Sequence, residues 1–152
     1  MKKLFLPVLV CLSFSGFAQK LYTKVNDSKV NSERLETAKR FISRYIEKCK
    51  NKDYSEFKDF TISKRIEKDL NTDREKGCVS AEKVTVLEFN SAYILKDTKY
   101  DDPVELFIFD INHSGSSSLK YISTWVYQDQ NVIDGIWISK EKPLYRNKKN
   151  TR

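Results

Sequence analysis

The spacing of the apolar residues changes halfway along the chain, and this change constrains the fold more than any other feature. From residue 35 to residue 49 the apolar side chains recur at helical intervals and form one stripe, which comprises Leu35, Ala38, Phe41, Ile42, Tyr45, Ile46 and Cys49. Asn31 or Ser32 can cap the start of this long helix. From Val84 onward apolar and polar residues alternate, as they do in strands with one buried face. Helices are therefore expected first, and a sheet afterwards.

Two shorter helices are predicted to follow the long one. Asp53, with a glutamate three residues later, matches a variant of the capping box and predicts a helix over residues 54–60. Thr61 or Ser63 can cap a third helix, which Gly77 is expected to end.

Four strands are predicted in the second half, at residues 84–95, 104–111, 119–127 and 132–138. Their connections are short and contain turn residues, whereas a parallel return needs a crossover of about a dozen residues or more. The sheet should therefore be an antiparallel meander. The helices are expected to pack on one face of this curved sheet, so helices and sheet together form a single α+β domain.

The strands are apolar on more than one face. By alternation Leu106 and Ile108 point to one side of the sheet, while Phe107 and Phe109 point to the other. Because the helices cover only one face, the second face also needs to be covered. The sheet is expected to curl around its own interior, to pair with another copy in a homodimer, or to bind a partner.

The first 18 residues have the composition of a cleavable export signal. Two lysines follow Met1, an apolar run comes next, and small residues lead to a cleavage point near Ala18. The apolar run is about 11 residues long, short of the roughly 20 that cross a bilayer, so a membrane anchor is the weaker alternative. After cleavage no stable membrane insertion is expected. The protein is predicted to be periplasmic or secreted, with a lead-in over residues 19–30, a domain over residues 31–140 and a basic tail over residues 141–152.

Export would remove Cys11 with the leader and place Cys49 and Cys78 in an oxidising compartment. These two cysteines are predicted to form a structural disulfide. A redox-active pair would favour a closely spaced Cys-x-x-Cys arrangement, and this pair does not have it.

The formal net charge of +7 does not indicate nucleic-acid binding. Two of the positive charges lie in the leader, and residues 140–152 carry six basic residues against one acid. The body between them is neutral by formal count and lacks the basic stripe that nucleic-acid recognition requires. Within residues 77–139 nine acids outnumber four lysines, so the sheet half has an acidic character.

Few residues suggest catalysis. His113 is the only histidine; it lies in a turn rich in serine and glycine, where a solvated side chain is expected. One histidine and two oxidised cysteines do not supply a zinc site. Asp110, within an apolar strand, would be a general base if it were buried. The sequence carries no nucleophile, metal or phosphate motif, so neither a metal nor a cofactor is predicted.

Aromatic residues are the strongest candidates for a binding site. Tyr121, Trp125 and Tyr127 share one side of a strand by alternation, and Trp137 lies on the next strand. Together with Tyr45 of the long helix they are the predicted ligand-binding residues, because aromatic rings with polar tips can line an apolar pocket and orient a ligand. Ordinary core packing is the alternative.

The order of these elements resembles the NTF2-like superfamily over residues 31–140. The resemblance lies in a long helix, a short helix opening with residues 51–57 (NKDYSEF), a further helix, and strands ending in residues 130–137 (QNVIDGIW). It implies a cone-shaped, cystatin-like α+β roll with a pocket between the long helix and the concave sheet. Some members of the superfamily use that pocket for isomerase or dehydratase chemistry, and many only bind or dimerise.

Together these features predict an exported, non-enzymatic binding domain for a small apolar ligand or a protein partner. One alternative is a periplasmic immunity protein or inhibitor, which would turn a charged surface such as the acidic sheet half toward a toxin. A second alternative is a pocket enzyme of the isomerase or dehydratase type. That enzyme requires a carboxylate that points into the cavity beside tyrosine or tryptophan donors.

Overall fold

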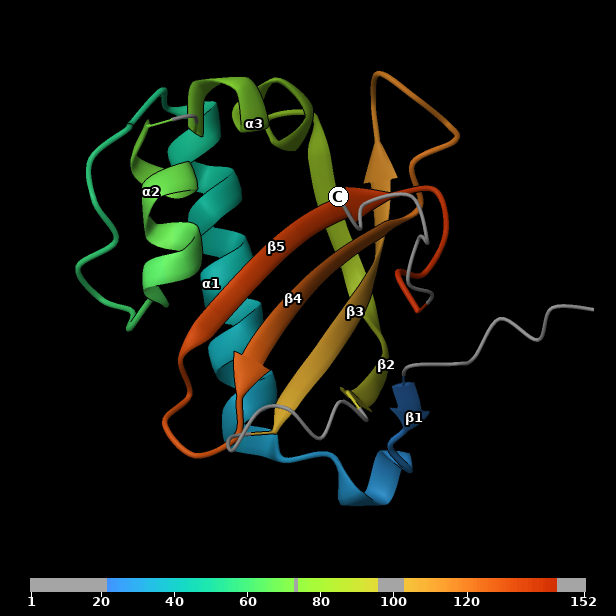
Figure 1. Cartoon of the computed structure of the whole chain (residues 1–152). Coiled ribbons are helices and arrows are strands. Elements are labelled where there is room, and N and C mark those ends of the chain that lie inside the picture. Colours follow the sequence, from blue (N-terminus) through green and yellow to red (C-terminus); the bar gives the residue numbers. More distant parts are fainter. Residues whose placement is uncertain (1–21, 73, 96–102, 145–152) are drawn as a thin grey trace, which may run out of the picture.

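The computed structural model describes residues 22–72, 74–95 and 103–144 (Figure 1). In chain order the elements are β1 (Tyr22–Lys24), the short 3-10 helix η1 (Asp27–Lys29), α1 (Ser32–Lys50), α2 (Lys64–Thr72), α3 (Arg74–Ala81), β2 (Val84–Leu95), β3 (Val104–His113), β4 (Tyr121–Tyr127) and β5 (Ile133–Ser139). The predicted leader lies outside the described residues, as does the basic tail beyond residue 144.

The strands form one curved antiparallel sheet in the order β1-β2-β3-β4-β5. This order confirms the predicted meander and the α+β class. β1 was not predicted, because a strand of three residues is too short to show alternation. It pairs only with the end of β2, where Tyr22 lies opposite Leu95.

α1 lies across one face of the sheet (Figure 1). Asn31 begins the helix, since its side-chain oxygen accepts a hydrogen bond from the backbone N–H of Arg34 at 2.9 Å. The predicted apolar stripe is buried against the strands, and both Phe41 and Phe107 are fully buried in this core. Arg34 also donates to the buried carboxylate of Glu105 at 2.8 Å, which joins the first turns of α1 to β3.

The predicted helix over residues 54–60 is wrong, because turns and bends occupy this segment. The Asp53 carboxylate accepts from the N–H of Ser55, two residues on, at 2.9 Å, rather than from the third residue as a capping box requires. Lys48, in the last turns of α1, donates to the same carboxylate at 2.6 Å. Asp53 therefore closes the end of α1 in an Asx turn and starts no new helix.

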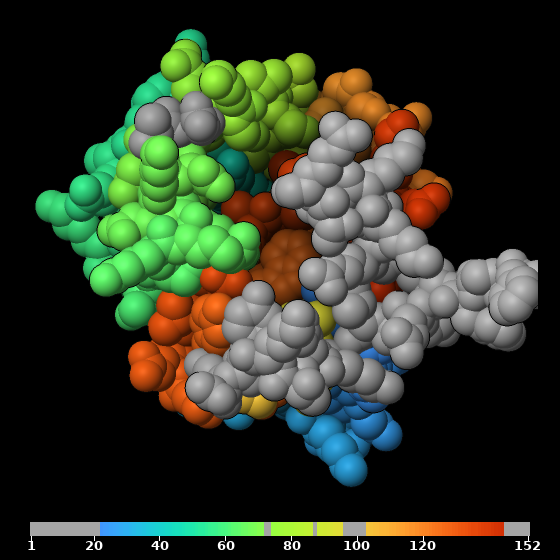
Figure 2. Space-filling view, viewed as in Figure 1, coloured from blue at the N-terminus to red at the C-terminus, as the bar shows by residue number. Residues whose placement is uncertain are grey.

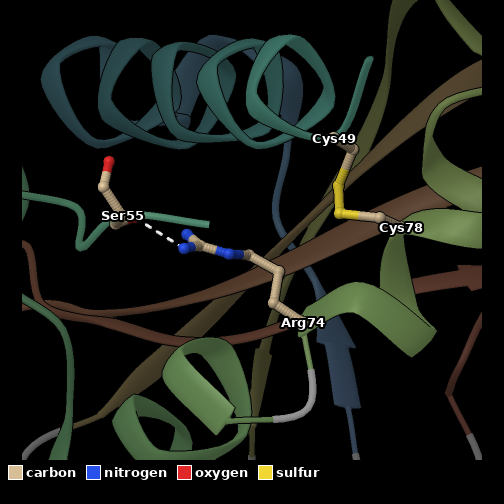
Figure 3. Close-up of a disulfide and its surroundings, with 4 residues drawn as sticks. All are labelled: Cys49, Ser55, Arg74 and Cys78. Carbon is tan, nitrogen blue, oxygen red and sulfur yellow. Dashed lines mark hydrogen bonds between the residues drawn. A yellow bond between two sulfur atoms is a disulfide. The ribbon is translucent and has the colours of Figure 1, made fainter. Parts of the chain in front are cut away.

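The segment after this turn is packed although it is not helical. The ring of Phe57 lies 5.3 Å from that of Phe41, measured between centroids. Lys48 Nζ and the Arg74 guanidinium carbon lie 5.5 and 5.0 Å from the Phe57 centroid, in the range of cation–π contacts. Arg74 also donates to the Ser55 carbonyl at 2.6 Å (Figure 3). The loop is thus fastened to both α1 and α3.

Gly77 does not end the helical region as predicted but lies inside α3. A Cβ atom at this position would lie 2.7 Å from the hydroxyl oxygen of Tyr45. The glycine therefore allows α3 to approach α1 closely, and the helical region continues to Ala81.

The predicted disulfide is confirmed: Cys49 and Cys78 join the end of α1 to α3 (Figure 3). The two sulfur atoms are 2.04 Å apart and both residues are buried. α1 and α3 are in contact around the bond. The disulfide therefore holds the short helix against the long one, ahead of the start of β2.

The sheet face turned away from α1 is also apolar, as predicted. Leu106 and Ile108 are fully buried there, although they do not belong to the core beneath α1. The register places Leu106 between Tyr93 of β2 and Trp125 of β4. A hydrogen bond of 2.9 Å joins Trp125 to Tyr22 of β1, across the two intervening strands. A curved sheet permits this contact between side chains three strands apart.

We expect loss of the disulfide to destabilise the protein by about 3 to 4 kcal/mol, the chain-entropy value for a closed loop of this length. The sequence separation of the two cysteines is 29 residues. Urea unfolding of the protein with and without a reductant measures the difference. The C49S/C78S variant should unfold like the reduced protein and should not respond to the reductant. An unchanged urea midpoint after full reduction would contradict the prediction.

The carboxylate at the end of α1 should make stability depend on pH. Hydrogen bonds from Lys48 and Ser55 hold the pKa of the Asp53 carboxyl well below its ordinary value. A lowered pKa in the folded state stabilises the protein above the unfolded pKa of about 4, and this stabilisation is lost as the pH falls toward the folded pKa.

Asp53→Asn should therefore lower the urea midpoint at pH 7 and reduce the further loss between pH 5 and pH 2. Asp59→Asn, an exposed aspartate of the same loop, is the matched control. Equal midpoints for the Asp53 variant and the parent protein at pH 7 would show that the carboxylate does not hold the turn.

Candidate ligand-binding cleft

A cavity of about 560 Å³ lies between α2 and the sheet face turned away from α1. Figure 2 views the molecule from this side, where a hollow lies beside the green atoms of α2, with orange and red strand atoms at its floor. The cavity is lined by Tyr22, Arg65, Ile66, Asp69, Leu70, Leu95, Val104, Trp125, Tyr127, Asp134, Gly135, Ile136 and Trp137. We call this cavity the aromatic cleft, because it brings together two tyrosines and two tryptophans.

The position of Trp125 depends on the glycine opposite it. Trp125 of β4 pairs with Gly135 of β5, next to a bulge that places Asp134 out of the regular register. A Cβ atom at position 135 would lie 2.8 Å from Cε3 of the indole. The indole thus rests directly on the β5 backbone, and a larger residue than glycine would push it away.

The polar end of the same indole is held by β1. Trp125 Nε1 donates to the Tyr22 hydroxyl at 2.9 Å, so both ends of the ring have fixed neighbours. Burial raises the pKa of the Tyr22 hydroxyl, which keeps this group neutral at physiological pH. The contact leaves the indole N–H satisfied inside the protein.

An ion pair forms the wall between α2 and β5. The Asp134 carboxylate accepts from Ser63 Oγ at 2.5 Å and from Arg65 Nη2 at 3.0 Å. Arg65 Nη2 also donates to the backbone carbonyl of Asp134. The chain just before α2 runs beside the start of β5, where the Ile133 N–H donates to the Thr61 carbonyl at 2.9 Å. These bonds fix α2 as one wall of the cleft.

Three of the described lining residues are exposed to solvent, and one of them, Arg65, is in the ion pair with Asp134. Asp69 lies one helical turn beyond Arg65 on α2, and it makes no hydrogen bond or ion pair with the part of the chain that the structure describes. Trp137 is 59% exposed, an unusual fraction for so large an apolar side chain. The cleft therefore offers an acid and an aromatic ring to a bound molecule.

The structure brings three of the five predicted ligand-binding residues together. Trp125, Tyr127 and Trp137 all line the aromatic cleft. Tyr121 points to the same side of β4 by alternation but is not a lining residue, and Lys142 lies 5.7 Å from its ring centroid. Tyr45 is buried in the core beneath α1, on the opposite face of the sheet. Whether the three cleft residues bind a ligand stays a prediction.

Sequence reasoning missed several residues that shape the cleft. Tyr22 lies close to the predicted cleavage point, where no periodicity marks a strand. Gly135 could have been noticed, since a glycine within an apolar strand pattern often marks a bulge or a close approach. Arg65 and Asp69 lie on a helix of mostly charged residues. Only the packing of α2 against β5 shows which of these charged residues face the cleft.

His113 is buried rather than solvated, contrary to expectation. β3 extends to this residue, and its Nδ1 accepts from the Gly115 N–H at 3.1 Å. Its Nε2 lies 3.3 Å from Ser80 Oγ. The histidine therefore fixes the turn after β3 against α3 and lies outside the aromatic cleft.

Asp110, the other candidate for chemistry, also lies outside the cleft. It is half-buried, and both of its oxygens accept from Asn90 Nδ2, at 2.9 and 3.1 Å. Lys142 donates to the side-chain oxygen of the same asparagine at 2.5 Å. This network connects residue 142 of the predicted tail to β2 and β3.

A second hollow lies where the resemblance implies a pocket, between α1 and the sheet. Two neighbouring cavities of about 550 and 450 Å³ follow α1 beside β2 and share Ser43 and Val86. Charges of both signs, including Glu36 and Lys39, line the larger one together with Phe89 and Phe109. None of the five predicted ligand-binding residues lies there.

Comparison of the chain with protein-family models, curated proteins and solved structures gives no match. The described helices include none that is long and apolar enough to cross a membrane. Within the same residues, no group of three histidine, cysteine or acidic side chains is placed to hold a metal ion.

We expect Gly135→Ala to displace the Trp125 indole and to destabilise the protein by about 1 to 3 kcal/mol, as overpacking does in other cores. Urea unfolding and the near-ultraviolet circular dichroism of tryptophan measure the two effects. Gly115→Ala is the comparison outside the cleft, because its Cβ would meet the flexible Lys83 side chain at 2.9 Å and the His113 ring only at 3.2 Å. Trp125→Leu should remove most of the cost of the alanine. A Gly135→Ala protein with parental stability and spectrum would refute the role of this glycine.

Proposed function

We propose that the protein is an exported, non-enzymatic domain that binds a small molecule with an apolar body in the aromatic cleft. The observation that carries this proposal is the arrangement of Trp125, which rests on Gly135 and is hydrogen bonded to Tyr22. Such a ring is ordered before a ligand arrives, so binding does not cost the entropy of fixing it.

The dimensions and the lining of the cleft support this proposal. Its volume of about 560 Å³ falls in the range of small-molecule sites. Aromatic and aliphatic side chains make up most of the lining, and the polar groups are few. This combination suits a ligand that is mainly apolar and has one polar end.

The hydrogen bonds of Asp134 and Asp110 favour binding over catalysis, and Asp69, the cleft acid without a hydrogen bond to any described residue, is exposed to water rather than desolvated as a tuned general base is. Asp134, the buried carboxylate of the cleft, accepts from both Ser63 and Arg65. A general base must instead have an oxygen in reach of a substrate proton. Asp110 and His113 have partners of their own away from the cleft.

Two observations support export. The first 18 residues have the charged start, apolar run and small residues of a signal peptide. The buried disulfide between Cys49 and Cys78 is the kind of bond that persists in oxidising compartments. A periplasmic or secreted location therefore agrees with both the sequence and the covalent structure.

The neutral fluorescent probe N-phenyl-1-naphthylamine tests the binding function. We expect the probe to bind the parent protein and Trp125→Ala to lower its affinity about tenfold or more, since a fully contacting aromatic ring contributes this much. Tyr54→Ala removes another aromatic side chain, 40% exposed and outside the cleft, and is the control. Equal probe binding by the folded Trp125→Ala protein and the parent would overturn the proposal.

A further inference from the structure

We propose that the ligand of the aromatic cleft is an organic cation, a molecule with an ammonium group attached to an apolar body. This inference rests on the proposed function and adds the charge of the ligand to it. It follows from the kind of rings that line the cleft and from the one acid there that has no partner in the described chain.

The rings of the cleft are the kinds that attract cations most strongly. All four aromatic residues in the described part of the lining are tryptophan or tyrosine, with neither phenylalanine nor histidine among them. The faces of these rings carry negative electrostatic potential, and tryptophan is the best partner for an ammonium or a methylated ammonium group. The hydrogen bond between Trp125 and Tyr22 holds the indole N–H, which leaves the ring face as the part available to a ligand.

The charged residues of the cleft add an anionic site. Among the residues that the structure describes, three lining residues carry charge, and two of them, Arg65 and Asp134, form an ion pair. Asp69 remains, without an ion pair or hydrogen bond to any described residue. The described part of the lining thus has a net formal charge of −1, in a chain whose overall formal charge is +7. A local negative charge in a basic protein selects for cations at this place.

The polar groups also argue against a neutral, polyhydroxylated ligand. A sugar needs several free donors and acceptors around its ring, because its hydroxyl groups lose their bonds to water on binding. In the cleft, the Trp125 N–H, the Asp134 carboxylate and the Arg65 guanidinium already bond within the protein. An ammonium group with methyl substituents requires no such bonds, since ring faces and one carboxylate suffice.

Choline and its neutral isostere 3,3-dimethylbutan-1-ol provide the test, because they have the same shape and differ in charge. Titration of each into the full folded protein, followed by tryptophan fluorescence and calorimetry, gives the two affinities. We expect choline to bind about tenfold more tightly than the alcohol. Raising the salt concentration should weaken the binding of choline and leave that of the alcohol unchanged.

Variants of α2 separate the role of the acid from that of the fold. Asp69→Asn should weaken choline binding about three- to tenfold and leave the binding of the alcohol unchanged. Glu67→Gln removes one negative charge from the exposed side of the same helix, outside the cleft, and should change neither affinity.

The outcomes distinguish this inference from the proposed function. Equal affinities for choline and the alcohol, or an Asp69→Asn protein that keeps the full preference of the parent for choline, would overturn the cationic ligand while the neutral probe still reports a binding cleft. Failure of choline to bind a folded protein that binds the neutral probe would overturn it as well. Failure of all three compounds would overturn both proposals.

Discussion

The burial of the α1 stripe against one face of the sheet is the contact on which the rest of the structure depends. Phe41 and Ile42 meet the strands there without leaving exposed surface. This contact uses the only long helix among the described residues. Leu106 and Ile108 make the opposite face equally apolar, so that face must be covered by something other than a long helix.

The remaining helices are short. The disulfide holds α3 to α1, and the ion pair of Arg65 and Asp134 holds α2 to β5. The aromatic cleft exists because α2 stands at the edge of that second face rather than over its centre.

Periodicity was sufficient to predict the elements that are long. α1 has five turns of regular spacing, and the four long strands alternate over seven or more residues, so their ends were predicted to within a few residues. The disulfide was also predictable, because Cys49 and Cys78 are the single pair left if Cys11 is removed with the expected leader. Alternation predicted that Tyr121, Trp125 and Tyr127 would share one side of a strand, beside Trp137 of the next strand, and the structure places all of these except Tyr121 in one cleft. These predictions use the periodicity of residues along the chain or the number of cysteines. Neither signal requires knowledge of the tertiary fold.

The errors concern residues whose local signal is ambiguous. The Asp53 carboxylate can begin a helix or close a turn, and the buried Lys48 ammonium beside it favours the turn. A glycine can end a helix, or it can lie inside a helix where another side chain packs against the backbone. Gly77 is of the second kind, because the Tyr45 hydroxyl occupies the space of its missing Cβ. A histidine beside serines can be solvated, yet β3 runs on far enough to bury His113 against α3. In each case the deciding group lies on another element, so the outcome depends on packing that a single segment does not encode.

The same reasoning explains why the cleft is only partly visible in the sequence. Trp125 is identifiable as an aromatic residue on the second face, but the position of its ring depends on two partners that are distant along the chain. Gly135 must lack a side chain beneath the ring, and Tyr22 must reach across two strands to the indole N–H. A tryptophan held at both ends cannot collapse into the hollow beside it, and the hollow stays open to a ligand. Trp137, 59% exposed at the side of the same cleft, has no such restraints among the described residues, so packing restricts the rotamer of its ring less than that of Trp125.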